Sequence, residues 1–165
     1  MKPAKALAAV LALMTAVLAQ QTGQTAPDFK LADLSGKPMT LASLKKPAVI
    51  TFWASWCEVC RAEFPGLHAV AKEKKLNHYV ISREPADSRK VVQDYMKQYP
   101  AFTPLVSLAG GDKAVDVYNR YKIFGQPWTF VLDTQAKIAW AHPGAVNVDE
   151  FKKQLAQVGV QREER

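Results

Sequence analysis

The stretch FWASWCEVCRAEFP, residues 52–65, contains both cysteines of the chain, Cys57 and Cys60. The run PAVITFWA at residues 47–54 is short, continuously apolar and rich in β-branched and aromatic residues, which predicts a strand buried on both faces. From Glu58 to Lys75, apolar residues recur at spacings near three and four, which predicts an amphipathic helix. The two cysteines therefore stand where a buried strand ends and a helix begins.

The rest of the sequence predicts a single α/β domain. Two short segments on either side of the turn LSGKP predict an N-terminal hairpin. Further strands are expected at residues 79–81, 128–132 and 137–141, and further helices at residues 87–99, 112–121 and from 147 or 148 to 158. The tight turn after residue 132 makes the last two strands antiparallel, whereas the earlier alternation of strands and helices favours parallel pairing. We expect a mixed central sheet with helices on both faces and the hairpin as an addition.

The two ends of the chain differ from this domain. Lys2 and Lys5 precede the uncharged apolar run 6–19, and the short residues before Gln20 complete the pattern of a secretory signal. The run is shorter than the ~20 residues of a membrane-spanning helix, so an uncleaved anchor is the less favoured alternative. The predicted divisions are a signal peptide at 1–19, a flexible lead at 20–26, the domain at 27–158 and a charged tail at 159–165. We expect export to the periplasm or another extracytoplasmic site.

The charge of the chain does not indicate a nucleic-acid partner. Basic residues number 22 and acidic residues 15, which gives a formal net charge of +7. The excess is scattered in small groups such as Lys45-Lys46 and Lys152-Lys153, and no basic cluster interleaves with aromatic residues. The pattern is that of solvated helix ends and faces.

Three kinds of site use two thiols this close together. A zinc site needs about four ligands, and none of His68, His78 and His142 has the spacing of a second ligand pair. We place these histidines on a helix face and at strand edges and assign them no chemistry. A structural disulfide closing a loop of about four residues contributes only about 2 kcal/mol, against about 4.7 kcal/mol for a loop of ~100 residues. A C-x-x-C motif beside a β-α pattern is the signature of a redox dithiol, which we favour.

The position of the pair suits that chemistry. Residues three apart in the first turn of a helix lie on one face with Cα atoms roughly 5–6 Å apart, within the range that a disulfide tolerates. The free N–H groups and the positive dipole end of the helix favour a thiolate at Cys57. A lowered thiol pKa makes Cys57 a better attacking group at neutral pH and a better leaving group.

Three motifs in the same order resemble a known family. They are APDF at residues 26–29 with its following L..L.GK pattern, FWA.WC..C at the centre, and FGQPWTFVLD at residues 124–133. The chain is similar, over roughly residues 26–158, to the thioredoxin fold and more narrowly to the exported TlpA/ResA-type thiol–disulfide oxidoreductases. The resemblance implies a thioredoxin-like three-layer sandwich.

The resemblance also assigns roles to individual residues. Cys57 matches the exposed nucleophile and Cys60 the buried resolving thiol. Pro127 matches the family's cis-proline, which lies against the disulfide and presents backbone to a substrate peptide. Trp56 is expected to shield the disulfide and to line the substrate face.

Glu63 is the matching acid, one turn beyond Cys60 on the same helix face. A carboxylate near the buried thiol can accept or return its proton, and apolar surroundings should raise the pKa of that carboxyl. The alternative is an ordinary solvated helix glutamate. Plain thioredoxin keeps its buried acid on the preceding strand, where this chain has Thr51, so Glu63 is the only candidate.

Two departures from the family pattern concern the substrate and the redox potential. The inner dipeptide is Glu58-Val59, where the family usually has proline second. Gln126 and Trp128 flank the proline where the family more often has small or hydroxyl residues. We include Gln126 and Trp128 in the predicted substrate-binding set, together with Trp56 and Pro127.

The predicted function is exchange of disulfides with partner proteins, as an enzyme and in the direction of a reductase. The redox-active disulfide Cys57–Cys60 carries the electrons, so no separate cofactor and no metal are expected. A membrane electron donor would reduce the pair again, the protein would act as a monomer, and the resemblance suggests apocytochrome c maturation as the task. The alternatives are a peroxiredoxin-type peroxidase, which shares the APDF-like lead but lacks the C-x-x-C partner, and a chaperone that binds Cu(I).

Overall fold

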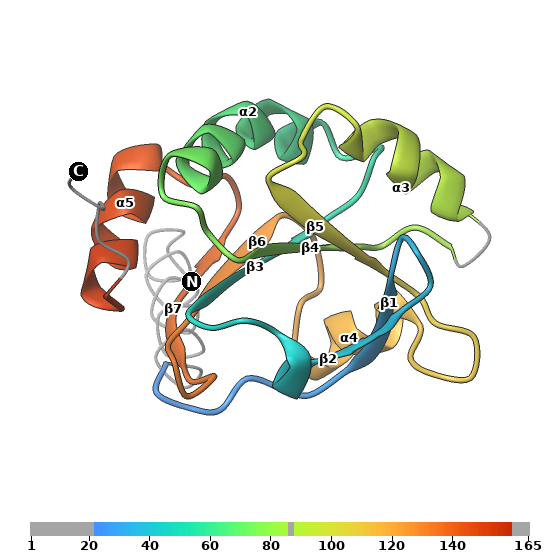
Figure 1. The fold of residues 1–165 in the computed structure, drawn as a ribbon. Coiled ribbons are helices and arrows are strands. Elements are labelled where there is room, and N and C mark those ends of the chain that lie inside the picture. The colour runs from blue at the N-terminus through green and yellow to red at the C-terminus, as the bar shows by residue number, and fades with distance from the viewer. Residues whose placement is uncertain (1–21, 86–87, 160–165) are drawn as a thin grey trace, which may run out of the picture.

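The computed structural model describes residues 22–85 and 88–159. A seven-stranded sheet with the order β2-β1-β5-β4-β3-β6-β7 forms the middle of the molecule (Figure 1). The strands are β1 (Lys30–Asp33), β2 (Pro38–Thr40), β3 (Ala48–Trp53), β4 (His78–Ser82), β5 (Phe102–Val106), β6 (Trp128–Leu132) and β7 (Ile138–Pro143). The helices are the 3₁₀ turn η1 (Leu41–Ser43), α2 (Glu58–Glu73), α3 (Arg89–Met96), α4 (Ala114–Arg120) and α5 (Val148–Gln157).

The helices lie on both faces of this sheet, as predicted. Helices α2, α3 and α5 cover one face, and α4 covers the other (Figure 1). Because side chains alternate along a strand, Val49 on β3 packs on the α2 side whereas Ile50 packs on the α4 side. Two hydrophobic cores result, one in each layer between the sheet and its helices. The fold is the expected three-layer α/β sandwich.

Strand β3 is the centre of the sheet. All six of its residues are buried, and it pairs in parallel with β4 and antiparallel with β6. A strand with neighbours on both sides and helices on both faces has no solvated surface, which explains why its residues are apolar except for Thr51. The antiparallel pairing of β6 with β7 and the hairpin of β1 with β2 are also confirmed.

Strand β5 is not among the strands expected from the sequence. It lies between β1 and β4 and is parallel to β4, but Pro104 within it argues against an interior strand. Pairing with β1 begins only at Leu105, so Pro104 lies where β5 has a strand neighbour on one side only, a position that tolerates a missing N–H. Helix α3 is shorter than the helix predicted at residues 87–99.

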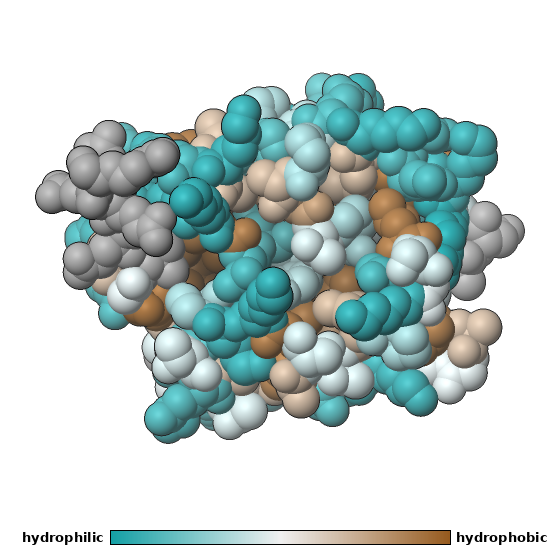
Figure 2. All heavy atoms as spheres, in the orientation of Figure 1, coloured by the Kyte–Doolittle hydropathy of each residue, from teal (hydrophilic) through white to brown (hydrophobic). Residues whose placement is uncertain are grey.

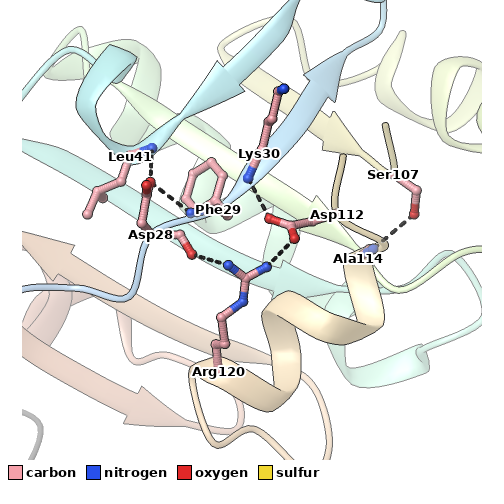
Figure 3. A network of polar contacts seen from close by, with 8 residues as sticks. All are labelled: Asp28, Phe29, Lys30, Leu41, Ser107, Asp112, Ala114 and Arg120. Atoms are coloured by element: carbon pink, nitrogen blue, oxygen red, sulfur yellow. Dashed lines mark hydrogen bonds and ion pairs between the residues drawn. The ribbon is translucent and has the colours of Figure 1, made fainter. Parts of the chain in front are cut away.

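A polar network joins the hairpin to α4 (Figure 3). The carboxylate of Asp112 accepts the backbone N–H of Lys30 at 2.6 Å and pairs with the guanidinium of Arg120. Arg120 also donates to the backbone carbonyl of Asp28 at 2.7 Å. The carboxylate of Asp28 accepts the N–H of Leu41 at 3.1 Å. These contacts explain why the APDF motif, residues 26–29, belongs to the folded domain.

Several sequence predictions fall outside the described residues. These are the signal peptide at 1–19, the first two residues of the lead and the tail beyond residue 159. Within the described ranges, no helix combines the length and the apolar character needed to cross a bilayer. Figure 2 shows one face of the molecule, on which hydrophilic side chains predominate and apolar residues appear in small patches between them.

Candidate active site

The two cysteines lie where the sequence placed them. Strand β3 ends at Trp53 and α2 begins at Glu58, and Cys57 is the N-cap residue of α2. The sulfur of Cys57 accepts the backbone N–H of Cys60 at 3.2 Å, so one of the free donors of the helix terminus is directed at this sulfur. The pair forms a disulfide with a Cα–Cα distance of 5.3 Å, within the predicted range. A negative charge that develops on the Cys57 sulfur is therefore stabilised by the helix.

The loop that carries the cis-proline faces this sulfur. The Gln126–Pro127 peptide bond is cis, as the resemblance implied, and the pairing of Phe52 with Trp128 places this loop beside the end of β3. The carbonyl oxygen of Gln126 lies 3.9 Å from the sulfur of Cys57. The loop thus presents a backbone carbonyl at the Cys57 sulfur.

Trp128 is half-buried and packs inward. Its ring stacks on Phe130 with centroids 5.8 Å apart, and it belongs to the hydrophobic core on the α4 side. Gln126 is half-buried as well. Of these two departures from the family pattern, Gln126 is the one whose polar atoms lie next to Cys57.

Glu63 is buried, which excludes the alternative of a solvated helix glutamate. Its side chain is 9% exposed. One carboxyl oxygen accepts the N–H of Val146 at 2.9 Å, and the other is buried without a hydrogen-bond partner. Burial raises the pKa of Glu63 to about 7, against the opposing effect of the Val146 N–H. Near neutral pH this carboxyl is therefore able both to take up and to release a proton.

A hollow in the surface leads to Glu63. Its lining combines the first turns of α2 with the segment before α5: Glu58, Val59, Ala62, Glu63, Gly66, Ala145, Val146 and Val148. Val59, in the position where the family usually has proline, is half exposed and lines this hollow. Glu63 thus lines a mostly apolar depression that also includes Glu58 and Val59, the two residues between the cysteines.

The aromatic residues of the two motifs differ in exposure. Trp56 is 63% exposed. Trp53 is fully buried and stacks on Tyr95, so it belongs to the core. Phe124, which the sequence analysis did not single out, is 93% exposed three residues before Pro127. The sequence signal that could have identified Phe124 is an aromatic residue in the loop that leads into the cis-proline.

Thr51 stands in a neutral polar cluster instead of an acidic site. Its hydroxyl contacts the Nε2 of His78 at 2.9 Å and the hydroxyl of Thr129 at 3.1 Å, and all three side chains are buried. His78 was expected at a strand edge; it is the first residue of β4, but β4 is an interior strand and His78 is buried. Burial lowers the pKa of His78 to about 3.

No grouping of three or more potential metal ligands occurs among the residues that the structure describes. What the site contains is a dithiol pair at a helix N-terminus, a backbone loop facing it and a buried acid one turn away. Such an arrangement exchanges disulfides.

The comparisons with known proteins agree with this chemistry. A model described as the AhpC/TSA family matches residues 22–141. The chain is 32% identical to the thioredoxin-like protein YneN of Bacillus subtilis, over 82% of this chain and 79% of that protein. It is 29% identical to the thiol-disulfide oxidoreductase ResA of Bacillus cereus, over 72% of this chain and 67% of that protein.

Among solved structures, the chain is similar to a thio-disulfide isomerase from Thermus thermophilus. The two share 48% sequence identity with a TM-score of 0.79, and the match covers 85% of this chain and 98% of that one.

Proposed function

We propose that this chain works outside the cytoplasm as a reductase of protein disulfides. The chain belongs to the AhpC/TSA family and is a thiol–disulfide oxidoreductase of the ResA type. The observation that carries the proposal is the pairing of two features. The Cys57 sulfur caps α2 and accepts an N–H there, while Glu63 is buried one turn beyond Cys60 with its pKa raised to about 7. One feature supplies a nucleophile and the other a proton acceptor.

In the proposed reaction, the Cys57 thiolate attacks one sulfur of a partner disulfide. A bond forms between Cys57 and that sulfur, the partner's S–S bond breaks, and its second sulfur leaves as a thiolate. The thiol of Cys60 then gives its proton to Glu63 and attacks Cys57. This step forms the Cys57–Cys60 disulfide and releases the first partner sulfur as a thiolate. The partner gains two electrons, and the pair loses two.

The surface around the pair is suited to a peptide. The backbone carbonyl of Gln126, just before Pro127, lies 3.9 Å from the Cys57 sulfur. Trp56, next to Cys57 in the sequence, and Phe124, three residues before Pro127, have exposed rings. An extended peptide pairs with exposed backbone groups through its own N–H and C=O groups, whatever its side chains. We therefore include Trp56, Gln126, Pro127 and Trp128 in the proposed substrate-binding set, with Trp128 supporting the loop from beneath.

The proposed setting follows from the N-terminal segment. The signal-like residues 1–19 support export, after which a membrane electron donor would return the Cys57–Cys60 disulfide to the dithiol. Similarity to ResA supports the cysteine pair of apocytochrome c as the partner disulfide that is reduced.

Trapping tests the proposed reaction. Replacing Cys60 by Ser should leave a partner covalently bound to Cys57, to be identified after non-reducing electrophoresis, whereas the variant that also carries Cys57→Ser should capture nothing. The reduction potential of the pair tests the direction, because a value near the ~−120 mV of a strong oxidant contradicts a reductase. An assay of peroxide consumption by the reduced protein separates this function from that of a peroxidase.

A further inference from the structure

A positively charged side chain lies beside the cis-proline loop. Arg83 directly follows β4, and its backbone N–H donates to the carbonyl of Trp53 at the end of β3 at 2.9 Å. Parallel strands bring their carboxyl ends to the same edge of a sheet, so Arg83 and the segment that carries Cys57 share that edge. The proposed mechanism gives no task to Arg83.

Two contacts hold the guanidinium in place. Its carbon lies 5.5 Å from the centre of the Tyr118 ring, a cation–π distance. That ring is itself fixed, because the buried Tyr118 hydroxyl donates to the carbonyl of Trp53 at 2.8 Å. From this platform the Nη1 of Arg83 reaches the side-chain oxygen of Gln126 at 3.4 Å. The side chain therefore extends from the end of β4 across to the loop that faces Cys57.

The charge of Arg83 is not neutralised within the part of the chain that the structure describes. None of the ion pairs between described residues includes it. The adjacent acid, Glu84, is engaged elsewhere, since its carboxylate accepts the N–H of Ser55 at 2.6 Å. A guanidinium carries five N–H donors in a planar fork that matches a carboxylate. Only Nη1 has a described side-chain partner, and Arg83 is half exposed.

The position of this charge points to the substrate. Gln126 links the two sites, because its side chain contacts Arg83 and its carbonyl oxygen lies 3.9 Å from the Cys57 sulfur. A peptide whose cysteine is attacked by Cys57 must pass along the same loop. A side chain within a residue or two of that cysteine then comes within reach of the guanidinium.

We propose that Arg83 makes this protein selective for partner disulfides in which an acidic residue flanks the cysteine that Cys57 attacks. The inference rests on the proposed function and names its substrate class. The acidic side chain would take guanidinium N–H groups that have no described side-chain partner, while Tyr118 and Gln126 hold the guanidinium beside the loop. The unusual Gln126 then has a role, because a small residue in its place offers no oxygen to Arg83.

Three disulfide peptides test this selectivity, identical except for Asp, Asn or Lys on both sides of one cysteine. The second-order rate constant for their reduction by the dithiol protein is followed by the release of peptide thiol. We expect the Asp peptide to react about fivefold faster than the Asn peptide and the Lys peptide to react more slowly, as one partly exposed ion pair allows. The preference should weaken as the salt concentration rises.

Arg83→Gln should bring the ratio between the Asp and Asn peptides to about one, and Arg83→Glu should favour the Lys peptide. The matched control is Lys137→Gln, which removes an exposed cation from the turn beside the start of β3, at the opposite end of the sheet. This control should keep the wild-type ratio. Because each ratio is taken within one protein sample, a variant that is partly unfolded does not change it.

Equal rates for the Asp and Asn peptides with the wild type would overturn the inference while leaving the proposed reductase intact. So would a preference that survives in Arg83→Gln. Failure of the wild-type dithiol to reduce any of the three peptides would contradict the proposed function itself, and the selectivity with it.

Discussion

Glu63 and His78 lie in the same layer, between the sheet and helices α2 and α5, and both are buried. Burial shifts the pKa of each group toward its neutral form, upward to about 7 for Glu63 and downward to about 3 for His78. Glu63 lines an open hollow next to the dithiol, whereas His78 is enclosed by Thr51 and the rings of Phe102 and Phe151. The same physical effect thus places one group where it exchanges protons near neutral pH and keeps the other uncharged.

The largest effect is expected from His78→Ala, on the stability of the protein. Removal of a fully enclosed ring leaves a cavity and takes a hydrogen-bond partner from Thr51, so we expect the free energy of unfolding to fall by about 3 kcal/mol. Urea unfolding of the oxidised protein measures the loss. The reduction potential should stay unchanged, and a large shift of the potential in this variant would place His78 in the redox chemistry after all.

Glu63→Gln should have the opposite pattern, with its main effect on the redox chemistry. The amide keeps an oxygen for the Val146 N–H but cannot accept the proton of Cys60, so turnover at pH 7 should fall about 100-fold, as expected for loss of a general base. Turnover of a disulfide peptide, followed from pH 5 to pH 9, should lose its inflection near pH 7. An unchanged profile would remove Glu63 from the proposed mechanism.

The smallest and most diagnostic effect is on the pH dependence of stability. The folded-state pKa of His78 is depressed, so the unfolded chain binds more protons as the pH falls below 6.5, and stability declines toward acid pH. The folded-state pKa of Glu63 is raised from 4.5, so the folded protein binds more protons between pH 4.5 and 7, and stability declines as the pH rises. The two slopes, each up to about 1.4 kcal/mol per pH unit, oppose one another between pH 4.5 and 6.5.

Each variant should therefore reveal the slope of the other group. In that window stability should rise with pH in Glu63→Gln and fall with pH in His78→Ala, relative to the wild type. Urea unfolding at half-unit pH steps measures both differences, and every other titrating group is common to the three proteins. Identical slopes in the wild type and in Glu63→Gln would mean that Glu63 does not titrate as its burial requires.

The sequence was informative where local pattern and structure coincide. The apolar run at β3, the start of α2 at Glu58 and the antiparallel pair β6–β7 were predicted from neighbouring residues alone. The disulfide geometry at Cys57 followed from its place at a helix start. The cis bond at Pro127 followed from the family resemblance.

What the sequence missed depends on residues that lie far apart in the chain. The burial of Glu63 was predicted, but its hydrogen bond from Val146, 83 positions later, was not, and the contact of Arg83 with Gln126 spans 43 positions. Strand β5 was not predicted because it contains Pro104. This proline is tolerated because the pairing of β5 with β1 begins only at Leu105, and no local sequence pattern shows where that pairing begins. Such long-range contacts decide whether a charged residue is solvated, buried or directed at a site.

The entry of the chain into the domain has a consequence for orientation. Thr25 bridges to Lys137, and Ala26 donates to the carbonyl of Ala136, so residues 23–26 run along the β6–β7 turn. That turn adjoins the start of β3, while Cys57 follows its end, roughly 20 Å away for six extended residues. A tether attached ahead of residue 22 would hold the domain at the end opposite to Cys57. The dithiol would then point away from the point of attachment.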